Sequence, residues 1–311
     1  MGRSFTMDNV LILGNGISRL LYHQQIMDYE GEVWGCNYAY LEYPDKIRRL
    51  AGHVVTMREA AEYAKENGLD LKVYGGNQGS FPEYFCKYTC PPEFMKDSGT
   101  TLVAQALAEG RPRIDVTGFD LGGPDVGSPR HWRLDKSGWI RRWRLIYERY
   151  RESWTVHFWG RDHLPVITTT DGAEYWGYAG NYKRTYPHID DDRYIALHYA
   201  LYGIPEKLNP EKPMDEVEIM WLEPPHEGKI MTRPRWYGEI EAKRGHCKIT
   251  KSPYDEEIFA QRMELEAKVD EIAESLPLKS LQLMAERRGL GNLDGTDRRG
   301  ILQLIGESDR V

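Results

Sequence analysis

Short apolar runs rich in β-branched residues alternate with longer segments of mixed polarity through the first half of the chain. The runs with the length and composition of strands are residues 9–13, 32–35, 53–57, 71–74, 113–117 and 155–158. The helix-like segments between them are residues 58–67, 100–109 and 137–150. Strands that alternate with helices predict βαβ units and a mainly parallel sheet with helices on both faces. We therefore expect an α/β domain over residues 7–167.

The helix expected at residues 137–150 carries a stripe of large apolar side chains on one face. The stripe comprises Trp139, Trp143, Ile146, Tyr147, Tyr150 and, just beyond the helix, Trp154. The opposite face comprises Arg141, Arg142, Arg144 and Arg151. This pattern is typical of a helix that packs one face on a core and exposes a charged face to water. A dedicated anion-binding role for the arginines is the alternative.

The periodicity weakens over residues 168–251, where tyrosine, tryptophan, proline and glycine accumulate. We expect an irregular, aromatic-rich α+β region there, with a helix near residues 191–202 and strands that include residues 216–222. Such aromatic density can stack a sugar or a base, and it can equally pack against a partner protein.

The last part of the chain is predicted to be helical. A charged helix is expected at residues 254–274, within a linking segment at 252–275. Residues 276–311 have the pattern of a helix, a glycine-rich extended turn and a second helix. The small core expected for this module comprises Leu281, Leu290, Ile301, Leu304 and Ile305.

Length and charge narrow the classes of protein. The 311 residues suffice for one large domain with smaller appendages, and the formal net charge is −7. An acidic chain argues against broad nucleic-acid binding, which needs a basic face. Because the chain has neither a long uncharged apolar run nor the apolar core of a signal peptide, we expect no membrane segment and a cytoplasmic location.

The cysteine pattern argues against both a disulfide framework and a metal site. Four irregularly spaced cysteines fit a reducing compartment and free thiols. Cys86 and Cys90 have a spacing that some zinc ligands share, but no second close pair follows, and His246 with Cys247 is the only other candidate. We assign no metal.

The strongest local motif is an apolar strand that runs directly into the turn Gly14-Asn15-Gly16-Ile17-Ser18. Glycines allow a backbone to approach a ligand closely, and the amides at the start of a following helix favour phosphate. The turn thus predicts a Rossmann-like domain that holds a phosphorylated small molecule. It differs from the dinucleotide fingerprint because Arg19 replaces the third glycine and the next strand ends in Cys36-Asn37, without an acidic ribose ligand. NAD is therefore disfavoured.

A second motif places polar residues at further turns of the predicted sheet. Ser98-Gly99-Thr100 stands where a helix begins, and either Ser98 or Thr100 is expected to cap it. Gly118-Phe119-Asp120 follows the next strand. Ligands of open parallel sheets collect outside the carboxyl ends of the strands, so these turns are expected to form one site.

Taken together, these motifs resemble those of the bacterial CMP-sialic-acid-dependent sialyltransferases over about the first 165 residues. The resemblance implies inverting transfer of a sugar from a nucleotide-sugar donor of the CMP type to a hydroxyl acceptor, with no obligatory metal or other cofactor. The donor site that it implies comprises Gly14, Asn15, Gly16, Ser18, Asn37, Ser98, Gly99, Thr100 and Asp120.

The resemblance also implies a histidine that acts as the general base on the acceptor hydroxyl. His131 is the residue that most nearly fits this role. A neutral imidazole suits proton removal at neutral pH. A simple surface histidine on the loop is the alternative interpretation.

The C-terminal segment resembles the small helix, extended loop, helix modules of the SAP type. Such modules bind nucleic acid or serve in docking, and they are frequent on proteins of phages and other mobile elements. Here the basic residues Lys279, Arg287, Arg288, Arg298 and Arg299 are nearly balanced by nearby acids, so docking is at least as well supported as nucleic-acid binding. A phage origin implies a location in the host cytoplasm or in the virion.

Three hypotheses about function follow. The first is a glycosyltransferase that uses a nucleotide sugar. The second is a non-catalytic structural or docking protein, for instance of a phage particle, that contacts a partner through residues 168–251 or 276–311. The third, ranked last because of the acidic charge, is an enzyme that modifies nucleic acid.

Overall fold

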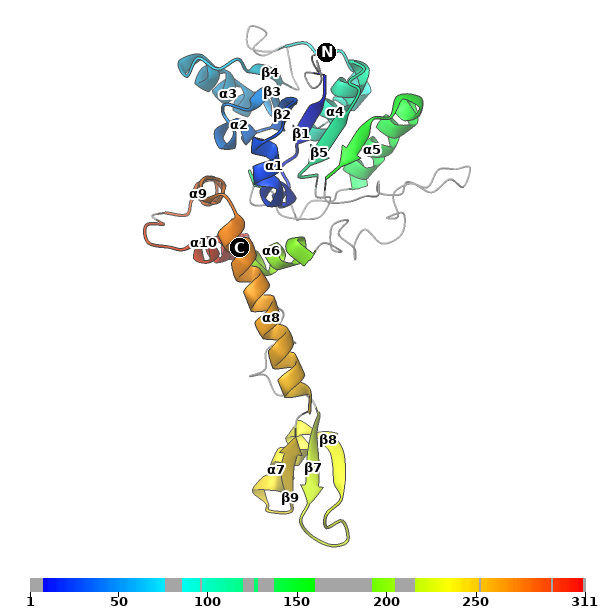
Figure 1. Ribbon diagram of the computed structural model, residues 1–311, viewed down its shortest axis with the longest axis vertical. Coiled ribbons are helices and arrows are strands. Elements are labelled where there is room, and N and C mark those ends of the chain that lie inside the picture. Colours follow the sequence, from blue (N-terminus) through cyan, green and yellow to red (C-terminus); the bar gives the residue numbers. More distant parts are fainter. Residues whose placement is uncertain are drawn as a thin grey trace, which may run out of the picture. The chain divides into compact units, whose positions relative to one another are not determined.

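The computed structural model describes residues 8–75, 86–95, 97–119, 126–127, 137–159, 192–204, 216–251, 253–291 and 293–309. The chain divides into two compact units (Figure 1). The first unit contains the described residues of Met1–Ile195 together with those of Ser275–Val311. The second unit is Ala196–Glu274, which is thus inserted between two parts of the first.

The described strands of the first unit form a six-stranded parallel sheet. In chain order they are β1 (Val10–Leu13), β2 (Glu32–Cys36), β3 (Ile47–Gly52), β4 (Lys72–Gly75), β5 (Ile114–Thr117) and β6 (Val156–Phe158). Their order in space is β4-β3-β2-β1-β5-β6. The chain thus builds outward from β1 to β4 and then returns to the other side of β1, so the strand order reverses between β1 and β5. This arrangement confirms the α/β Rossmann-like fold class.

Helices cover both faces of the sheet. The helices described between β1 and β6 are η1 (Ile17–Tyr22), α1 (His23–Met27), α2 (Ala39–Glu42), α3 (Val54–Glu66), η2 (Pro92–Phe94), α4 (Ser98–Ala108), α5 (Ser137–Tyr150) and η4 (Arg151–Ser153), of which η4 has no buried residue. All four residues of β1 are buried. Val10 and Ile12 pack in one core with residues of α4 and α5, whereas Leu11 and Leu13 pack in another with residues of α2 and α3. Burial on both faces explains why the strand is a continuous apolar run.

The apolar stripe of α5 lies as expected on the core. Trp143 and Ile146 are fully buried, and Tyr147, Tyr150 and Trp154 are partly buried against the same cluster. The helix has the bounds that its periodicity predicts.

The strand expected at residues 53–57 is wrong, because α3 begins at Val54. The β-branched run is the first turn of a helix whose buried residues Met57, Ala60 and Ala64 recur every three or four positions. The strand lies just before it, as β3 at Ile47–Gly52, and its two arginines conceal the apolar pattern.

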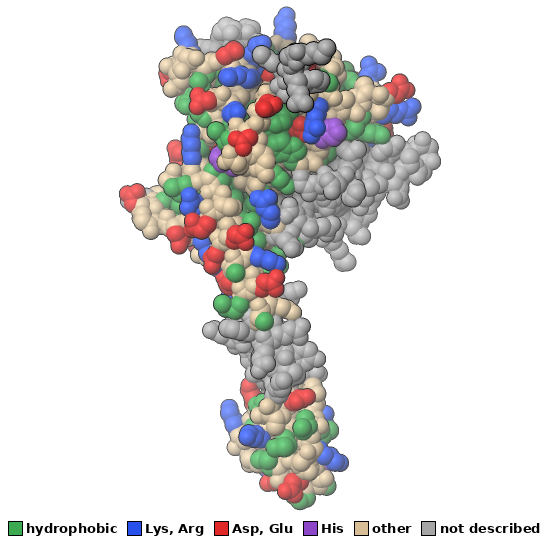
Figure 2. Space-filling model, in the orientation of Figure 1, with side chains coloured by type: hydrophobic (Ala, Val, Ile, Leu, Met, Phe, Trp, Pro, Cys, Tyr) green, Lys and Arg blue, Asp and Glu red, His purple; other side chains and the backbone are tan. Residues whose placement is uncertain are grey.

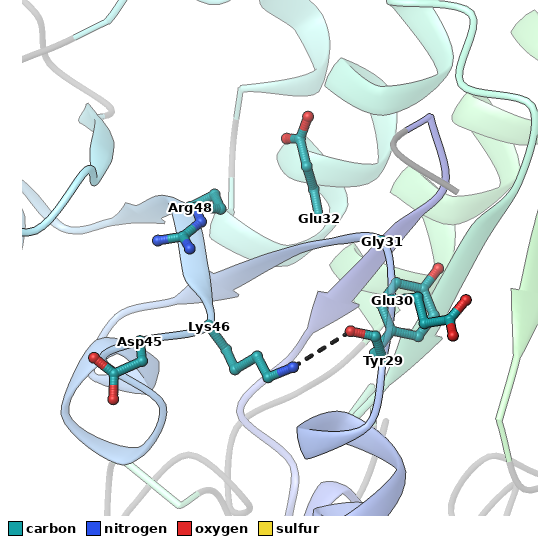
Figure 3. Close-up of a pocket in the computed structure, with 7 residues that line it drawn as sticks. All are labelled: Tyr29, Glu30, Gly31, Glu32, Asp45, Lys46 and Arg48. Carbon is teal, nitrogen blue, oxygen red and sulfur yellow. Dashed lines mark hydrogen bonds between the residues drawn. The ribbon is translucent and has the colours of Figure 1, made fainter. Parts of the chain in front are cut away.

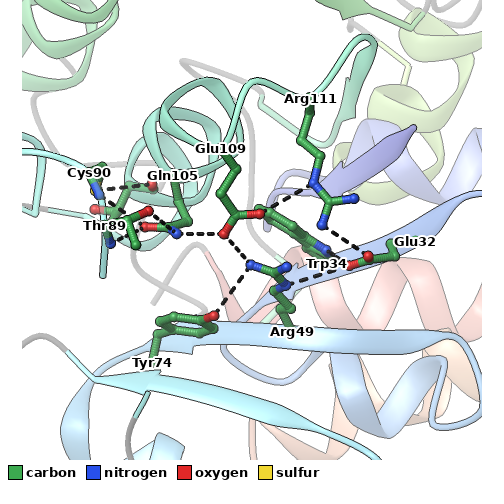
Figure 4. A network of polar contacts seen from close by, with 10 residues as sticks. Glu32, Trp34, Arg49, Tyr74, Thr89, Cys90, Gln105, Glu109 and Arg111 are labelled. Carbon is green, nitrogen blue, oxygen red and sulfur yellow. Dashed lines mark hydrogen bonds and ion pairs between the residues drawn. The ribbon is translucent and has the colours of Figure 1, made fainter. Parts of the chain in front are cut away.

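Arg49 of β3 is accommodated by a polar network on the sheet surface (Figure 4). Its guanidinium lies 4.2 Å from the ring centroid of Trp34 and pairs with Glu109 and Glu32. Arg111 pairs with the same two carboxylates, which closes a ring of two arginines and two glutamates. These ion pairs, with their hydrogen bonds from Trp34 and Gln105, lower the pKa of both glutamates against the opposing effect of burial.

The C-terminal helices α9 (Leu278–Glu286) and α10 (Arg298–Ser308) belong to the first unit, where α9 contacts α2. Leu281, Ile301 and Ile305 are buried, as expected. Leu290 is only partly buried, and the core position expected for Leu304 is wrong because its side chain is 37% exposed. The remaining buried side chains of the pair are Ser280, Met284, Ala285 and Leu302.

The second unit contains a three-stranded antiparallel sheet in the order β8-β7-β9. Its elements are β7 (Glu216–Trp221), β8 (Ile230–Pro234), α7 (Arg235–Lys243), β9 (Cys247–Lys251) and most of α6 (Asp192–Tyr202) and of α8 (Pro253–Ser275). The small core of this sheet is built on Ile219 and Cys247. The expected helix near residues 191–202, the strand at 216–222 and the charged helix are confirmed.

Among the described residues, no helix has both the length and the apolar character that crossing a membrane requires.

Candidate functional site

Most of the described candidate residues lie at the edge of the parallel sheet where its strands end. Gly14 to Gly16 follow β1, Asn37 follows β2, and Gly118 follows β5. Ser98 and Gly99 begin α4, which packs on β1, β2, β3 and β5. A Cβ atom on Gly99 would lie 2.7 Å from the ring of Phe119, so the start of α4 is beside the turn that follows β5. Sequence reasoning thus places these turns correctly at one edge.

The turns after β1 and β5 are packed backbone against backbone. The amide of Gly14 donates to the carbonyl of Thr117, and the amide of Gly16 donates to the carbonyl of Gly118, each at 2.8 Å. A Cβ atom on Gly14 would lie less than 3.0 Å from both the carbonyl carbon and the carbonyl oxygen of Gly118. The close approach that glycine permits at position 14 is therefore an approach to the neighbouring turn. Two amides of the motif are already used within the protein.

The segment that follows the glycine turn is a 3₁₀-helix, η1, continued by the short α1. Gly16 is its N-cap, and Ser18 is only 6% exposed. Five- and six-residue helices carry little macrodipole compared with the long helix that follows the glycine turn of a dinucleotide-binding domain. The phosphate-binding contribution expected from this helix end is correspondingly small.

A buried ion pair lies behind the glycine turn. Arg19 is 1% exposed, donates to the carbonyl of Gly14 and pairs with the carboxylate of Glu42, which is itself buried on α2. A second weak contact joins Arg19 Nη1 to Asn15 Oδ1 at 3.5 Å. Arg19 therefore stands where the dinucleotide fingerprint has its third glycine, and its contacts with Gly14 and Glu42 hold the turn in place. Sequence reasoning missed Glu42, because no local pattern links residues that are 23 positions apart.

Asn37 adopts the left-handed conformation, with φ of 48°, in which asparagine is favoured over most non-glycine residues. Its amide donates to the carbonyl of Ala51 at 2.9 Å. Its side-chain oxygen lies close over Gly52, where any Cβ atom would be 2.6 Å away. The left-handed backbone conformation is therefore sufficient to explain why position 37 is an asparagine. The side chain of Asn37 stays partly exposed at the sheet edge.

The cap of α4 is Asp97, which corrects the expectation that Ser98 or Thr100 caps it. The carboxylate of Asp97 accepts from the amide of Thr100 at 2.9 Å and from its hydroxyl at 2.7 Å. Asp97 also pairs with Arg142 of α5. Thr100 is 2% exposed and its hydroxyl is engaged, whereas Ser98 stays partly exposed.

We expect Asp97→Ala to lower the free energy of unfolding by about 1–2 kcal/mol, because it removes the helix cap and the ion pair to Arg142 together. Ser98→Ala, one position on, should change it by less than about 0.5 kcal/mol. Urea denaturation of both variants measures the difference. Equal losses in the two variants would contradict the assignment of the cap.

Among the candidate residues that the structure describes, those whose side chains remain partly exposed at this edge are Asn15, Asn37 and Ser98. They are neutral hydrogen-bonding groups, which suit a base, a ribose or a sugar. Further described candidates are buried and can contribute only to the packing beneath this edge; they are Gly14, Gly16, Ser18 and Thr100. Asp120 and His131 lie outside the described residues.

Metal-binding geometry is not found among the described residues, which contain no group of three or more histidine, cysteine or acidic side chains suitably placed. All four cysteines fall in the described ranges and no disulfide joins them. Burial raises the pKa of Cys90 to about 11. Its thiol therefore stays protonated at neutral pH.

A hollow at the opposite, amino edge of the sheet is unrelated to the predicted site (Figure 3). It is lined by Tyr29, Glu30, Gly31, Glu32, Asp45, Lys46 and Arg48. Lys46 donates to the carbonyl of Tyr29 at 3.4 Å, and the other charges are mixed in sign. None of the candidate residues lies there.

The surface charges are also mixed. On the face shown in Figure 2, basic and acidic side chains are interspersed over each unit instead of forming an area of one sign. A continuous basic face, which nucleic-acid binding would use, is not seen on this face.

No protein-family model matches the chain, and neither the curated proteins nor the solved structures give a match.

Proposed function

We propose that this protein binds a nucleotide sugar of the CMP type at the carboxyl edge of its parallel sheet and transfers the sugar to a hydroxyl acceptor with inversion. The observation that carries the proposal is the reversal of strand order between β1 and β5, where Gly14 and Gly118 hold the two turns together. Open parallel sheets bind their ligands outside the strand ends at such a reversal.

In this proposal, the partly exposed side chains of Asn15, Asn37 and Ser98 bind different parts of the donor. Asn15 lies at the reversal itself, Asn37 lies one strand away, and Ser98 begins the helix that packs beneath both strands. Amide and hydroxyl groups both donate and accept, which suits the base, the ribose and the phosphate of a nucleotide. Arg19 and Glu42 contribute indirectly by fixing the backbone next to Asn15.

His131 is the proposed general base. Its neutral imidazole accepts the proton of the acceptor hydroxyl while the hydroxyl oxygen forms a bond to the anomeric carbon of the donor. The bond from that carbon to the phosphate oxygen breaks at the same time, and its electron pair leaves with CMP. One in-line displacement of this kind inverts the configuration at the anomeric carbon.

A non-catalytic docking protein is the second candidate, and one observation favours it. The amides of Gly14 and Gly16 donate to the carbonyls of Thr117, the last residue of β5, and of Gly118 in the turn that follows. The glycine turn after β1 thus offers a phosphate fewer donors than the open glycine loop of a dinucleotide-binding domain does.

The test is the thermal stability of the full chain with CMP, CMP-sialic acid and other nucleotides. A ligand present at 100 times its dissociation constant stabilises the native state by about 2.7 kcal/mol. We expect a clear rise in Tm with a cytidine nucleotide that Asn15→Ala abolishes. Asn67→Ala, an exposed asparagine at the end of α3, is the control and should keep the shift.

Turnover tests the catalytic part of the proposal. With a donor that binds, His131→Ala should lower the rate of transfer by about 10²–10⁴-fold and leave donor affinity unchanged. If no nucleotide raises Tm at millimolar concentration, the transferase proposal fails and the docking protein becomes the better description.

A further inference from the structure

The ring of Tyr38, the residue directly after Asn37, is held between three parts of the first unit. The guanidinium carbon of Arg287 lies 3.4 Å from the ring centroid. Gly127 also adjoins the ring, since a Cβ atom at that position would lie 3.3 Å from Cδ2 of Tyr38. Thr56 donates to the phenolic oxygen at 3.4 Å. Tyr38 therefore joins α3, the segment after β5 and the C-terminal helices at the carboxyl edge of the sheet.

The packing of the C-terminal helix pair positions Arg287 beside Tyr38. Figure 1 shows α9 and α10 on the side of the sheet where the strands end. Ser280 of α9 is buried and forms a side-chain hydrogen bond with Tyr43, which follows α2. Arg287 is the C-cap of α9, which ends at Glu286, and Gly289, with φ of 68°, lies in the turn that follows. The position of Arg287 is thus set by a packed helix with a defined end.

Two adjacent arginines at this helix end have different surroundings. Arg288 forms an ion pair with Asp309 through Nε at 2.9 Å and Nη2 at 3.0 Å, and both side chains are fully buried. Arg287 is exposed, and no carboxylate of the described residues lies within ion-pair distance of it. Arg288 therefore links the ends of α9 and α10, whereas the charge of Arg287 is available to bind an anion.

A guanidinium stacked on an aromatic ring keeps its hydrogen-bonding edge free. The stacking orients the planar group and uses its face, while the N–H groups in its plane can still bind two oxygens of one anion. Such bidentate contacts to phosphate are stronger and more specific than those of a lysine.

We propose that Arg287 is a phosphate-binding residue of the site at the carboxyl edge, and that the C-terminal helix pair is a part of that site. The inference rests on the proposed function in that the phosphate is taken to be that of the nucleotide donor held by Asn37 and its neighbours. It differs from a docking role, in which the helix pair would leave ligand binding unaffected.

The test is calorimetric titration of the full chain with inorganic pyrophosphate and, separately, with CMP. Arg287→Gln should weaken both by about tenfold or more, because it removes charged hydrogen bonds. Arg287→Lys should bind with intermediate affinity, since it keeps the charge and loses the bidentate geometry. Lys279→Gln removes the same charge from an exposed position about 12 Å away along α9 and should change affinity less than twofold.

The outcomes separate the two proposals. If the unmodified protein binds pyrophosphate through Arg287 but binds no nucleotide, Arg287 remains a phosphate-binding residue, the phosphate is not that of a nucleotide donor, and the proposed function fails. If CMP and pyrophosphate bind equally well to the unmodified protein and to Arg287→Gln, the inference is overturned and the proposed function survives. Binding of neither probe, or equal weakening by Lys279→Gln, also overturns the inference. Circular dichroism of each variant confirms that the fold is intact.

Discussion

Gly14→Ala is expected to lower the free energy of unfolding by about 3 kcal/mol or more, the upper end of the effect of overpacking. The added methyl group would meet the carbonyl of Gly118, which is backbone and cannot rotate away as a side chain would. The clash can be removed only if β1 and β5 separate at their ends, and this separation would stretch the hydrogen bonds donated by Gly14 and Gly16. Urea denaturation gives the change in stability.

Gly138→Ala is the matched control for this experiment. Gly138 lies in α5, and nothing is found within 4 Å of a Cβ atom there. Alanine is the better helix former, so this variant should be unchanged or more stable by up to about 1 kcal/mol. If Gly14→Ala proved as stable as Gly138→Ala, the two turns would not be packed as described.

Breaking the buried pair of Arg19 and Glu42 should have a comparable effect. Glu42→Gln and Arg19→Met are each expected to cost about 3–5 kcal/mol, because each leaves a buried charge without its partner. Arg19 also donates to the carbonyl of Gly14, so its loss should loosen the turn that carries Asn15. We therefore expect Arg19→Met also to lower the affinity for any ligand that binds at that turn.

The double variant Arg19→Met with Glu42→Leu distinguishes a pair from two independent residues. It removes both charges, so its loss should be clearly smaller than the sum of the single losses. Glu62→Gln serves as the control, since the pair of Arg58 and Glu62 on α3 is exposed and should contribute less than about 0.5 kcal/mol. Additive single losses would show that Arg19 and Glu42 do not depend on each other.

Sequence periodicity predicts those elements whose burial is uniform along the chain. β1 is apolar throughout because both of its faces are covered, and α5 carries one continuous stripe toward the core. The local pattern does not predict β3. Its residue Arg49 is stabilised by Glu109, which is 60 positions away and therefore outside any local pattern. The β-branched run at residues 53–57 has the composition of a strand, but such a run also fits the first turn of a helix.

The candidate site was predictable in its location and less so in its construction. The strand ends of a parallel sheet meet at one edge, so turns after β1, β2 and β5 could be assigned to one place from their order alone. The partners that hold these turns come from distant parts of the chain: Gly118 supports Gly14, Glu42 supports Arg19, and Arg287 stacks on Tyr38. Their pairing depends on the completed fold and leaves no trace in the spacing of residues.

The insertion of residues 196–274 into the first unit has a consequence for synthesis on the ribosome. The sheet strands emerge first, the whole second unit follows, and α9 with α10 emerges only after that. Until then Tyr38 and Tyr43 lack the side chains that cover them in the finished protein. Domains generally begin to fold as their residues emerge, so the nascent first unit must persist for the synthesis of 79 residues with this surface uncovered.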